Sequence, residues 1–534
     1  MTQYKTIERP STATIGYPPL TNLSQLLTEH AQTQPERIAI GISDLSHVVN
    51  YQKLELLVNS AKTQLSLLGL NRSHTVALLA DNCIEFVVAL LAVTSFGARL
   101  APLNPSLTVI DVQARLNALS AHALLIPKHL ENQVDHSAFL SGTSALWTVN
   151  VEVSSSSAAV HIHDIANKTP AAEAGTSSSL IAGDDVALVM FTAGSTGAPK
   201  AVPWTHRNIL ESIRNIASWY DLSPADATLI VMPMFHGHGL VAGLLATLVS
   251  GGSVYLPTTG GFSAHLFWPD MVRVRATWFT AVPTIHRILV NRASQDYPGL
   301  SAPALRFIRS CSAPIDEDLA TAMDKTFGAP VISAYGMTEA THQVSSNPLP
   351  MHGTNRISSV GLPTGVEMRI VAEDGNDLPV GGIGEVWVRG ATVISGYLEN
   401  PEANASSFSD GWFRSGDLGS MDTPGYLDLK GRIKEQINRG GEKIAPGDID
   451  VALLSNPAVL EAVAFPEPHP IYGECVHAAV VLRSGSNASE QELEDYCRSK
   501  LSSFEVPERI HIVSSIPNTA KGAVDRRALS TQFR

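Results

Sequence analysis

The feature that most constrains the fold is an alternation of short apolar runs with longer stretches of helical spacing. Runs such as TVALLAD, ALVMFTA, DATLIVMPM, ATWFTAVP and PVISAYG end in small or turn-forming residues. Between such runs lie IEFVVALLAVTSFG and HRNILESIRNIASWY, whose apolar residues recur at three and four positions. This alternation predicts parallel sheets covered by helices on both faces. In such folds, ligands bind at the carboxyl ends of the strands.

The chain has 534 residues, which is more than one hydrophobic core normally organises, so we expect at least two domains. From about Gly381 the pattern changes to Gly-punctuated alternation, as in GEVWVRG and GYLDLKGR, which predicts antiparallel strands. A compact tail with strand and helix signals follows GRIKEQINRGGEKI. We therefore predict domains at residues 1–432 and 433–534.

Charge and cysteine content narrow the class of protein. The net charge is −13, and no extended Lys/Arg run is present, which argues against a sequence-independent nucleic-acid binder. The four cysteines are sparse and lack metal-type spacing, as expected for free thiols in a reducing compartment. The apolar run VALLADNCIEFVVALLAV carries three polar residues and fits buried helix and strand better than a membrane span. We expect a cytoplasmic protein without membrane insertion.

The segment FTAGSTGAPKAV, residues 191–202, predicts a phosphate-binding loop. It offers the hydroxyls of Thr192, Ser195 and Thr196, several small residues, and then Lys200. Small residues let backbone N–H groups approach a phosphate, hydroxyls donate to its oxygens, and lysine supplies charge. It is not a Walker A loop, because that motif needs Gly-Lys-Ser/Thr. A flexible Gly/Ser turn would look similar, so further markers are needed.

Three later segments supply them. In SAYGMTEATH, Tyr335 offers an aromatic face suited to a purine, and Glu339 offers a carboxylate suited to Mg²⁺. In WFRSGDLG, Asp417 lies in a turn where a carboxylate could accept both hydroxyls of a ribose. GRIKEQINRGGEKI then offers Arg432 and Lys434. A phosphate loop, an aromatic-plus-acid loop, a ribose-type acid and a basic segment follow one another along the chain.

In this order the four motifs resemble the adenylate-forming superfamily of acyl-CoA synthetases, adenylation domains and firefly-type luciferases. The resemblance runs from about residue 20 to Arg527. It implies an α/β fold, with a large N-terminal domain of two flavodoxin-like α/β subdomains plus a small β-barrel, and a small mobile α+β C-terminal domain. It also implies ATP, Mg²⁺ and CoA. The acid attacks the α-phosphate of ATP to give an acyl-adenylate, and a thiol then displaces AMP. A luciferase-like oxygenase is a more remote alternative.

The resemblance also implies roles for individual residues. The catalytic positions would be Lys200, Thr338, Glu339, His236 and Ala523, with Glu339 holding the metal. ATP or AMP would contact Thr192, Ser195, Thr196, Gly197, Lys200, Ser312, Ala313, Tyr335, Gly336, Met337, Thr338, Asp417 and Arg432. Lys434 would be the hinge for rotation of the C-terminal domain, and Gly440 and Gly441 would line the CoA tunnel.

The sequence between these motifs indicates which acid is the substrate. FWPDM, ATWFTAVPTIH, LRFIRSCSA and MTEATHQVSSNPLP are similar to the oxalate–CoA ligases of plants and fungi, and the match places oxalate at His236, Ser312 and His342. A two-carbon dicarboxylate needs a short polar pocket, whereas a long-chain acid needs an apolar tunnel. His236 also aligns with a gate found across the superfamily, and we assign His238 to a structural role. Other short, aromatic or fatty acids stay open as substrates.

One position departs from the family pattern. A run like PKTASGKIxRR normally carries a lysine that acts in adenylation, but this chain reads PNTAKGAVDRR, with Ala523 at that position and Lys521 two residues earlier. Three hypotheses follow. The alanine is an engineered substitution that slows adenylation, which we prefer; Lys521 has taken over; or the protein binds nucleotide or acid without turnover.

Overall fold

The computed structural model describes residues 20–134, 139–140, 142–154, 157–165, 180–192, 199–439, 442–517 and 524–533. It divides into two compact units. One comprises Met1–Glu367 with Val388–Phe413, and the other comprises Met368–Trp387 with Arg414–Arg534. The predicted domain boundary between residues 432 and 433 falls inside the second unit and stays a prediction.

The first unit contains a nine-stranded sheet with the order β16-β15-β14-β13-β12-β10-β11-β1-β2. The six strands β1, β11, β10, β12, β13 and β14 pair in parallel with their neighbours in that order. Strand β2 pairs antiparallel with β1, β15 with β14, and β16 with β15. The strands are β1 (Ile38–Ile42), β2 (Val48–Asn50), β10 (Ala227–Leu229), β11 (Ser253–Leu256), β12 (Trp278–Ala281), β13 (Phe307–Ser310), β14 (Val331–Met337), β15 (His342–Ser346) and β16 (Leu362–Pro363).

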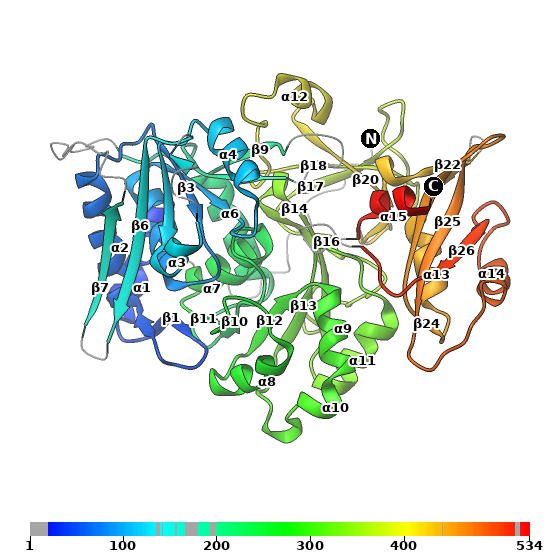
Figure 1. The fold of residues 1–534 in the computed structure, drawn as a ribbon, viewed down its shortest axis with the longest axis horizontal. Helices are drawn as coiled ribbons and strands as arrows, with labels where there is room; N and C mark the ends of the chain where they lie inside the picture. The colour runs from blue at the N-terminus through cyan, green and yellow to red at the C-terminus, as the bar shows by residue number, and fades with distance from the viewer. Residues whose placement is uncertain are drawn as a thin grey trace. The chain divides into compact units, whose positions relative to one another are not determined.

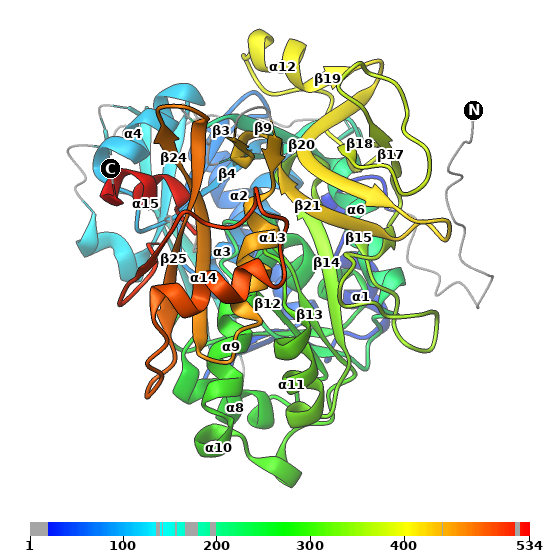
Figure 2. The ribbon, with the colours of Figure 1, turned by 90° about the vertical axis from the view of Figure 1, so that its right-hand side faces the viewer.

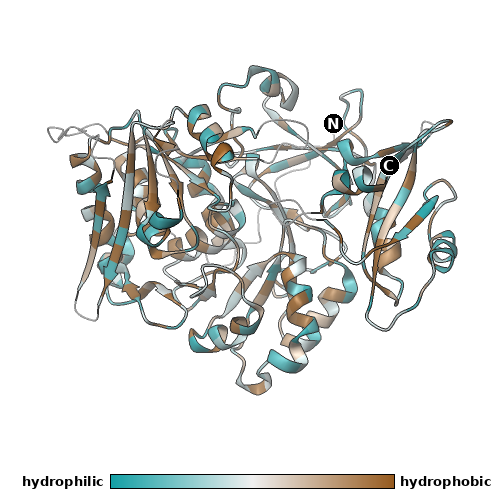
Figure 3. Ribbon diagram, viewed as in Figure 1, coloured by the Kyte–Doolittle hydropathy of each residue, from teal (hydrophilic) through white to brown (hydrophobic). Residues whose placement is uncertain are grey.

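Helices cover this sheet through their apolar faces. Figure 1 shows α8 to α11 grouped below β12 and β13, and Figure 3 shows the same helices striped with apolar and polar residues. Trp268, Phe279 and Met323, from a helix, a strand and a second helix, share one buried cluster. The helices are α8 (Ala264–Arg273), α9 (Pro283–Asn291), α10 (Ala293–Asp296) and α11 (Glu317–Phe327), with a 3-10 turn η4 (Gly299–Ser301) before β13.

A seven-stranded sheet with the order β7-β6-β5-β3-β4-β8-β9 lies in the same unit. Its strands are β3 (Thr75–Leu79), β4 (Arg99–Leu103), β5 (Ala123–Pro127), β6 (Ala145–Val153), β7 (Ala158–Asp164), β8 (Val186–Phe191) and β9 (Ala201–Thr205). The helical elements of this half are η1 (Leu23–Gln25), α1 (Thr28–Thr33), α2 (Tyr51–Leu67), α3 (Ile84–Phe96), α4 (Val109–Ala118), η2 (Lys128–Gln133), α6 (His206–Trp219), the π-helix η3 (His238–Leu245) and α7 (Ala246–Val249). Among the described helices, including the apolar α3, none has the length and hydropathy needed to cross a bilayer.

The region after residue 366 is built from smaller sheets. One has the order β17-β18-β20-β19, with β21 paired antiparallel to β20. Its elements are β17 (Glu367–Val371), β18 (Gly384–Arg389), α12 (Pro401–Ser407), β19 (Phe408–Ser409), β20 (Trp412–Met421) and β21 (Leu427–Arg432). The antiparallel strands expected after Gly381 are therefore present.

The C-terminal sheet has the order β23-β22-β25-β24, with β26 beside β25. Figure 2 shows α13 and α14 in front of this sheet. Ala462 and Ala464 of β24 face the cluster that α13 and α14 share, whereas Val463 and Phe465 face Leu529 of α15. The elements are η6 (Ile433–Glu435), β22 (Ile437–Arg439), β23 (Glu442–Ile444), α13 (Pro446–Leu454), β24 (Val459–His469), β25 (Gly473–Leu482), α14 (Glu490–Arg498), β26 (Arg509–Ile512) and α15 (Arg526–Phe533).

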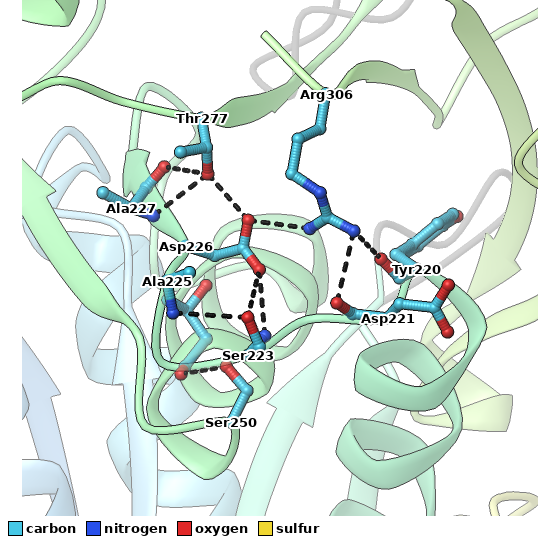
Figure 4. A network of polar contacts seen from close by, with 10 residues as sticks. Tyr220, Asp221, Ser223, Ala225, Asp226, Ala227, Ser250, Thr277 and Arg306 are labelled. Carbon is cyan, nitrogen blue, oxygen red and sulfur yellow. Dashed lines mark hydrogen bonds and ion pairs between the residues drawn. The ribbon is translucent and has the colours of Figure 1, made fainter. Parts of the chain in front are cut away.

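A buried carboxylate ties together the amino ends of β10, β12 and β13 (Figure 4). Asp226 accepts hydrogen bonds from Thr277 Oγ1 at 2.8 Å, from Ser223 N at 2.9 Å and from Arg306 Nη1 at 2.7 Å. Arg306 Nη2 also donates to the carbonyl of Tyr220, at the carboxyl end of α6, at 3.0 Å. This network fixes the strand ends opposite to the edge where the α/β fold is expected to bind ligands.

The α/β class predicted from the alternating pattern is confirmed, with two large sheets and smaller sheets after them.

Candidate active site

The predicted phosphate loop joins two strands of a hairpin. β8 and β9 pair antiparallel, with Phe191 opposite Ala201, and the N–H of Thr192 donates to the carbonyl of Lys200 at 3.1 Å. Thr192 and Lys200 therefore face each other at the base of the loop. Ser195, Thr196 and Gly197 lie outside the described residues.

Lys200 and Glu339, predicted to serve the phosphates and the metal, converge on one tyrosine. The Nζ of Lys200 lies 4.4 Å from the ring centroid of Tyr397, and the Tyr397 hydroxyl donates to Glu339 Oε1 at 2.8 Å. Burial and the Glu339 carboxylate raise the pKa of Tyr397, so its hydroxyl stays a donor. Backbone bonds from Ile394 N to Glu339 O (2.9 Å) and from Leu398 N to Ala201 O (3.0 Å) fix the segment.

Sequence reasoning missed Tyr397. It lies in ISGYLEN, between β18 and α12, and nothing local marks it as a partner of residues 58 and 197 positions away. The one available signal is a tyrosine directly after Gly396.

The SAYGMTEATH segment forms the end of β14, the 3-10 turn η5 (Thr338–Ala340) and the start of β15. Tyr335 is buried, whereas Gly336, Met337 and Thr338 are half-buried. The Thr338 carbonyl accepts from Trp204 Nε1 at 2.7 Å. A Cβ at Gly336 would lie 2.0 Å from the carbonyl oxygen of His342, so only glycine fits where the two strands meet.

The candidate acid-binding residues Ser312 and His342 lie at either side of His238. His238 Nδ1 is 3.1 Å from Ser312 Oγ, and its ring stacks on the His342 ring with centroids 5.3 Å apart. Ser312 and the neighbouring Ala313 are exposed, whereas His238 and His342 are buried. The structural role that we assigned to His238 therefore has to be widened, because the side chain joins two predicted substrate residues.

The backbone at this site is unusual. Ser312 has φ of 74°, Thr341 of 49° and His342 of 84°, values in the left-handed region that side chains other than glycine rarely adopt. Strain of this kind clusters at ligand sites. Here it turns Ser312 and His342 toward His238.

The lowered pKa values of His342 and His238 keep both rings neutral near pH 7. Burial and the nearby Arg309 guanidinium lower the pKa of His342 well below the ordinary histidine value. The pKa of His238 is lowered for the same two reasons, with smaller contributions from His342, His286 and His236. The site therefore presents neutral hydrogen-bonding groups, and its positive charge lies on Arg309, which donates to His342.

His236 lies in the turn before η3. It is half-buried, and its ring packs edge-on against Phe235 at a centroid distance of 4.7 Å. The Leu240 N–H donates to its carbonyl at 2.9 Å. His236 therefore lies in the same segment as His238, two residues before it.

The predicted ribose pair is also brought together. Asp417 of β20 lies opposite Arg432 of β21, and Arg432 Nε is 3.0 Å from Asp417 Oδ1. Asp417 is buried, whereas Arg432 is exposed. Lys434, the predicted hinge, follows in η6 and is exposed.

The predicted tunnel and lysine positions, Gly440, Gly441, Lys521 and Ala523, lie outside the described residues. The base of the loop that carries the last two is described. The Asp525 N–H donates to the Pro517 carbonyl at 2.9 Å. Arg526 binds the half-buried Asp450 carboxylate and the Ala464 carbonyl. Arg526, which follows the undescribed residues, is therefore held against α13 and β24.

Within the described part of the chain, a separate group of potential metal ligands comprises Asp81, Cys83 and His129. His129 is already paired with Asp81 at 3.0 Å. Burial, together with Glu85 and Asp81, raises the pKa of the Cys83 thiol well above its ordinary value, which disfavours the thiolate that metals bind. This group lacks the character of a metal centre.

Comparison with known proteins gives consistent matches along the chain. The model of the family described as AMP-binding enzyme matches residues 27–398, and that of the AMP-binding enzyme C-terminal domain matches residues 448–523. An oxalate–CoA ligase of Arabidopsis thaliana is 41% identical over 511 residues, covering 96% of this chain and 98% of the relative. One from Saccharomyces cerevisiae is 37% identical, covering 93% and 95%. ATP-bound MatB from Rhodopseudomonas palustris has a TM-score of 0.84 at 26% identity, covering 96% and 99% of the chains.

Proposed function

The chain belongs to the AMP-binding enzyme family and is an acid–CoA ligase, and on that premise we propose that the acid it activates is oxalate. The relatives of 41% and 37% identity are oxalate–CoA ligases. The observation that carries the proposal is the polar cluster of Ser312, His238 and His342, because hydrogen-bonding side chains suit a second carboxylate rather than an alkyl chain.

In the first half-reaction, a carboxylate oxygen of the acid attacks the α-phosphorus of ATP. The bond from that phosphorus to the bridging oxygen breaks, and pyrophosphate leaves. Lys200, together with the predicted loop hydroxyls, would bind the phosphates. Negative charge gathers at this centre, so preorganised cations and donors stabilise the transition state most.

A magnesium ion fits the acidic side chain beside Lys200. Mg²⁺ in nucleotide enzymes is typically bound by one or two carboxylates together with substrate phosphates. Glu339 supplies such a carboxylate, and Tyr397 orients it by donating to one of its two oxygens. When bound, the ion would neutralise phosphate charge.

In the second half-reaction, the CoA sulfur attacks the carbonyl carbon of the adenylate, and the bond to the AMP oxygen breaks. Asp417 and Arg432 would hold the ribose, and Lys434 would serve as the pivot for the C-terminal domain. Gly440 and Gly441 would line the CoA tunnel. These roles follow the family motif at each position.

Position 523 bears on the first half-reaction alone. We propose that alanine there makes the chain slow in forming the adenylate while leaving thiol transfer near normal. Losing one preorganised cation typically costs about 10²–10³ in rate. Ala523→Lys should restore adenylation by that factor, and Lys521→Ala should change little. Brisk turnover of the present chain that Lys521→Ala abolishes would make Lys521 the catalytic lysine.

The substrate is tested by CoA-dependent AMP release with oxalate, malonate, acetate, benzoate and hexanoate, measured on the present chain and on Ala523→Lys. We expect the highest kcat/KM for oxalate in both. A higher value for any other acid rejects oxalate as the preferred substrate, and absence of AMP release with every acid even in Ala523→Lys favours a binding protein without turnover.

A further inference from the structure

Arg309 of β13 is a fully buried arginine in contact with His342 of the candidate acid site. It uses all three nitrogens of its guanidinium. Nε donates to the Tyr220 hydroxyl at 3.0 Å, Nη1 to Thr280 Oγ1 at 3.1 Å, and Nη2 to His342 Nε2 at 3.1 Å and Gln343 Oε1 at 3.0 Å. Each of these acceptors is a neutral group.

Within the described residues, no carboxylate lies within 4 Å of this guanidinium, although arginine keeps its charge in proteins. A buried charge without an opposite charge is costly, and folded proteins normally pair it. Arg306, three residues earlier, is paired with Asp226 at 2.7 Å. The uncompensated charge of Arg309 indicates that an anion completes the site.

The bond from Arg309 fixes the tautomer of His342. A guanidinium can only donate, so His342 Nε2 must accept, and the ring proton resides on Nδ1. His342 is only 6% exposed. None of the described residues makes a hydrogen bond to its Nδ1, which lies 3.3 Å from the position that a Cβ on Gly336 would occupy. His342 therefore offers a free N–H beside Gly336.

A second chain of hydrogen bonds leads from Arg309 to Ser312. Thr280 Oγ1 accepts from Arg309 and lies 2.6 Å from His238 Nε2. In the tautomer in which the Thr280 hydroxyl donates to His238 Nε2, the His238 ring proton resides on Nδ1 and is donated to Ser312 Oγ at 3.1 Å. The exposed Ser312 hydroxyl is then left to donate outward.

We propose that Arg309 is a positioning residue that selects acids with a second anionic group. It sets both histidines in the Nδ1–H form, so that His342 and Ser312 present two donors to the second carboxylate, and its own charge favours a dianion over a monoanion. This inference rests on the proposed function and deepens it, since it assigns the discrimination to a side chain that does not touch the acid.

The test measures the ratio of kcat/KM for oxalate to that for acetate in three variants. Arg309→Gln should lower the oxalate value by about 10–100-fold, mainly through KM, with the KM for ATP within about twofold and acetate much less affected. Arg309→Lys, which keeps the charge, should recover part of the loss. Arg306→Gln is the matched control, because it removes a neighbouring arginine of the same segment and should leave the ratio unchanged.

Histidine ring ¹⁵N spectra supply a second readout. The parent should show His342 and His238 as neutral Nδ1–H tautomers, and Arg309→Gln should release His342 into a mixture. If oxalate and acetate efficiencies fall in parallel in a folded Arg309→Gln, or if the His342 tautomer is unchanged, Arg309 is merely structural and the inference is overturned.

Thr280→Val covers the case in which Arg309 variants do not fold. It interrupts the path to His238 and Ser312, so the oxalate-to-acetate ratio should fall about 3–10-fold, and an unchanged ratio overturns the inference. If the parent does not use oxalate, the proposed substrate fails separately. The inference then survives only if the best acid carries a second anionic group, and a monocarboxylate as best substrate overturns it.

Discussion

Two arginines three residues apart serve opposite ends of the same strand. Arg306 precedes β13 and is neutralised by Asp226, whereas Arg309 near the end of β13 has only neutral partners among the described residues. At the amino end, charge is balanced within the fold, as Figure 4 shows. At the carboxyl end it is left for a ligand to balance. The two ends of the strand therefore differ in purpose. A paired charge stabilises the fold, whereas an unpaired charge is available to attract an anionic ligand.

The largest expected effect is a loss of activity from a substitution at the carboxyl ends of the strands. Glu339→Gln should lower the rate of adenylate formation by about 10²–10³-fold, because it removes the carboxylate available to a metal where phosphate charge develops. The measurement is pyrophosphate release under saturating ATP. The melting temperature should stay within a few degrees of the parent. Normal pyrophosphate release would show that Glu339 does not serve the phosphates.

At the amino end of β13, a substitution should lower the free energy of unfolding by a similar amount. Arg306→Met leaves the buried Asp226 carboxylate without its cation and should cost about 3 kcal/mol, near the low end for a broken buried pair because three other hydrogen bonds to Asp226 persist. Urea denaturation measures this loss. The kcat/KM for oxalate of the folded protein should not change, and a matching loss of activity would break the contrast between the two ends.

His342→Ala should have a smaller and selective effect. Loss of a hydrogen bond to a charged carboxylate should cost about 1.5–3 kcal/mol in kcat/KM for oxalate, with the KM for ATP little changed. Steady-state kinetics with both substrates varied provides the measurement. Equal oxalate efficiency in the parent and the variant would remove His342 from the pocket.

The smallest effect concerns pH. Because burial and Arg309 lower the pKa values of His342 and His238 well below 6.5, neither should titrate between pH 6 and 8. The KM for oxalate should therefore show no histidine transition in that range. His236, Cys311 and Tyr220 also surround the Arg309 cluster, so a transition there would be assigned with a His236→Gln control.

The same histidines lower stability in acid. Histidines that are neutral when folded but protonate near pH 6.5 when unfolded stabilise the fold above that pH, and the contribution is lost as pH falls. His206 and His286, whose pKa values burial lowers to about 4, add to this loss. Each such group should contribute a slope of about 1.4 kcal/mol per pH unit between the two pKa values.

Sequence reasoning could predict the alternating fold and the loops, because the turn residues and hydroxyls that define them are contiguous. It placed Lys200, Glu339 and the pair Asp417–Arg432 in segments that the structure brings into contact with one another or with a shared partner. Segments of this kind can be recognised from the sequence because the residues that define them are adjacent to one another.

It could not distinguish Arg306 from Arg309, which share the run LRFIRSCSA. Their roles depend on groups 29 to 89 positions away, such as Asp226 for one and Thr280 and His342 for the other. The contacts of Tyr397 and His238 could not be predicted for the same reason, because their partners are distant in the sequence and come together only in the folded chain. Whether a buried charge is compensated is a property of the fold.

The left-handed backbone at Ser312, Thr341 and His342 also limits how such a pocket can be changed in the laboratory. A random library at these positions would be filtered first by conformation, because β-branched and bulky residues tolerate these angles poorly. Glycine and asparagine would be over-represented among folded variants. Re-engineering acid selectivity should therefore start from Thr280 or Arg309, where ordinary backbone geometry leaves more amino acids available.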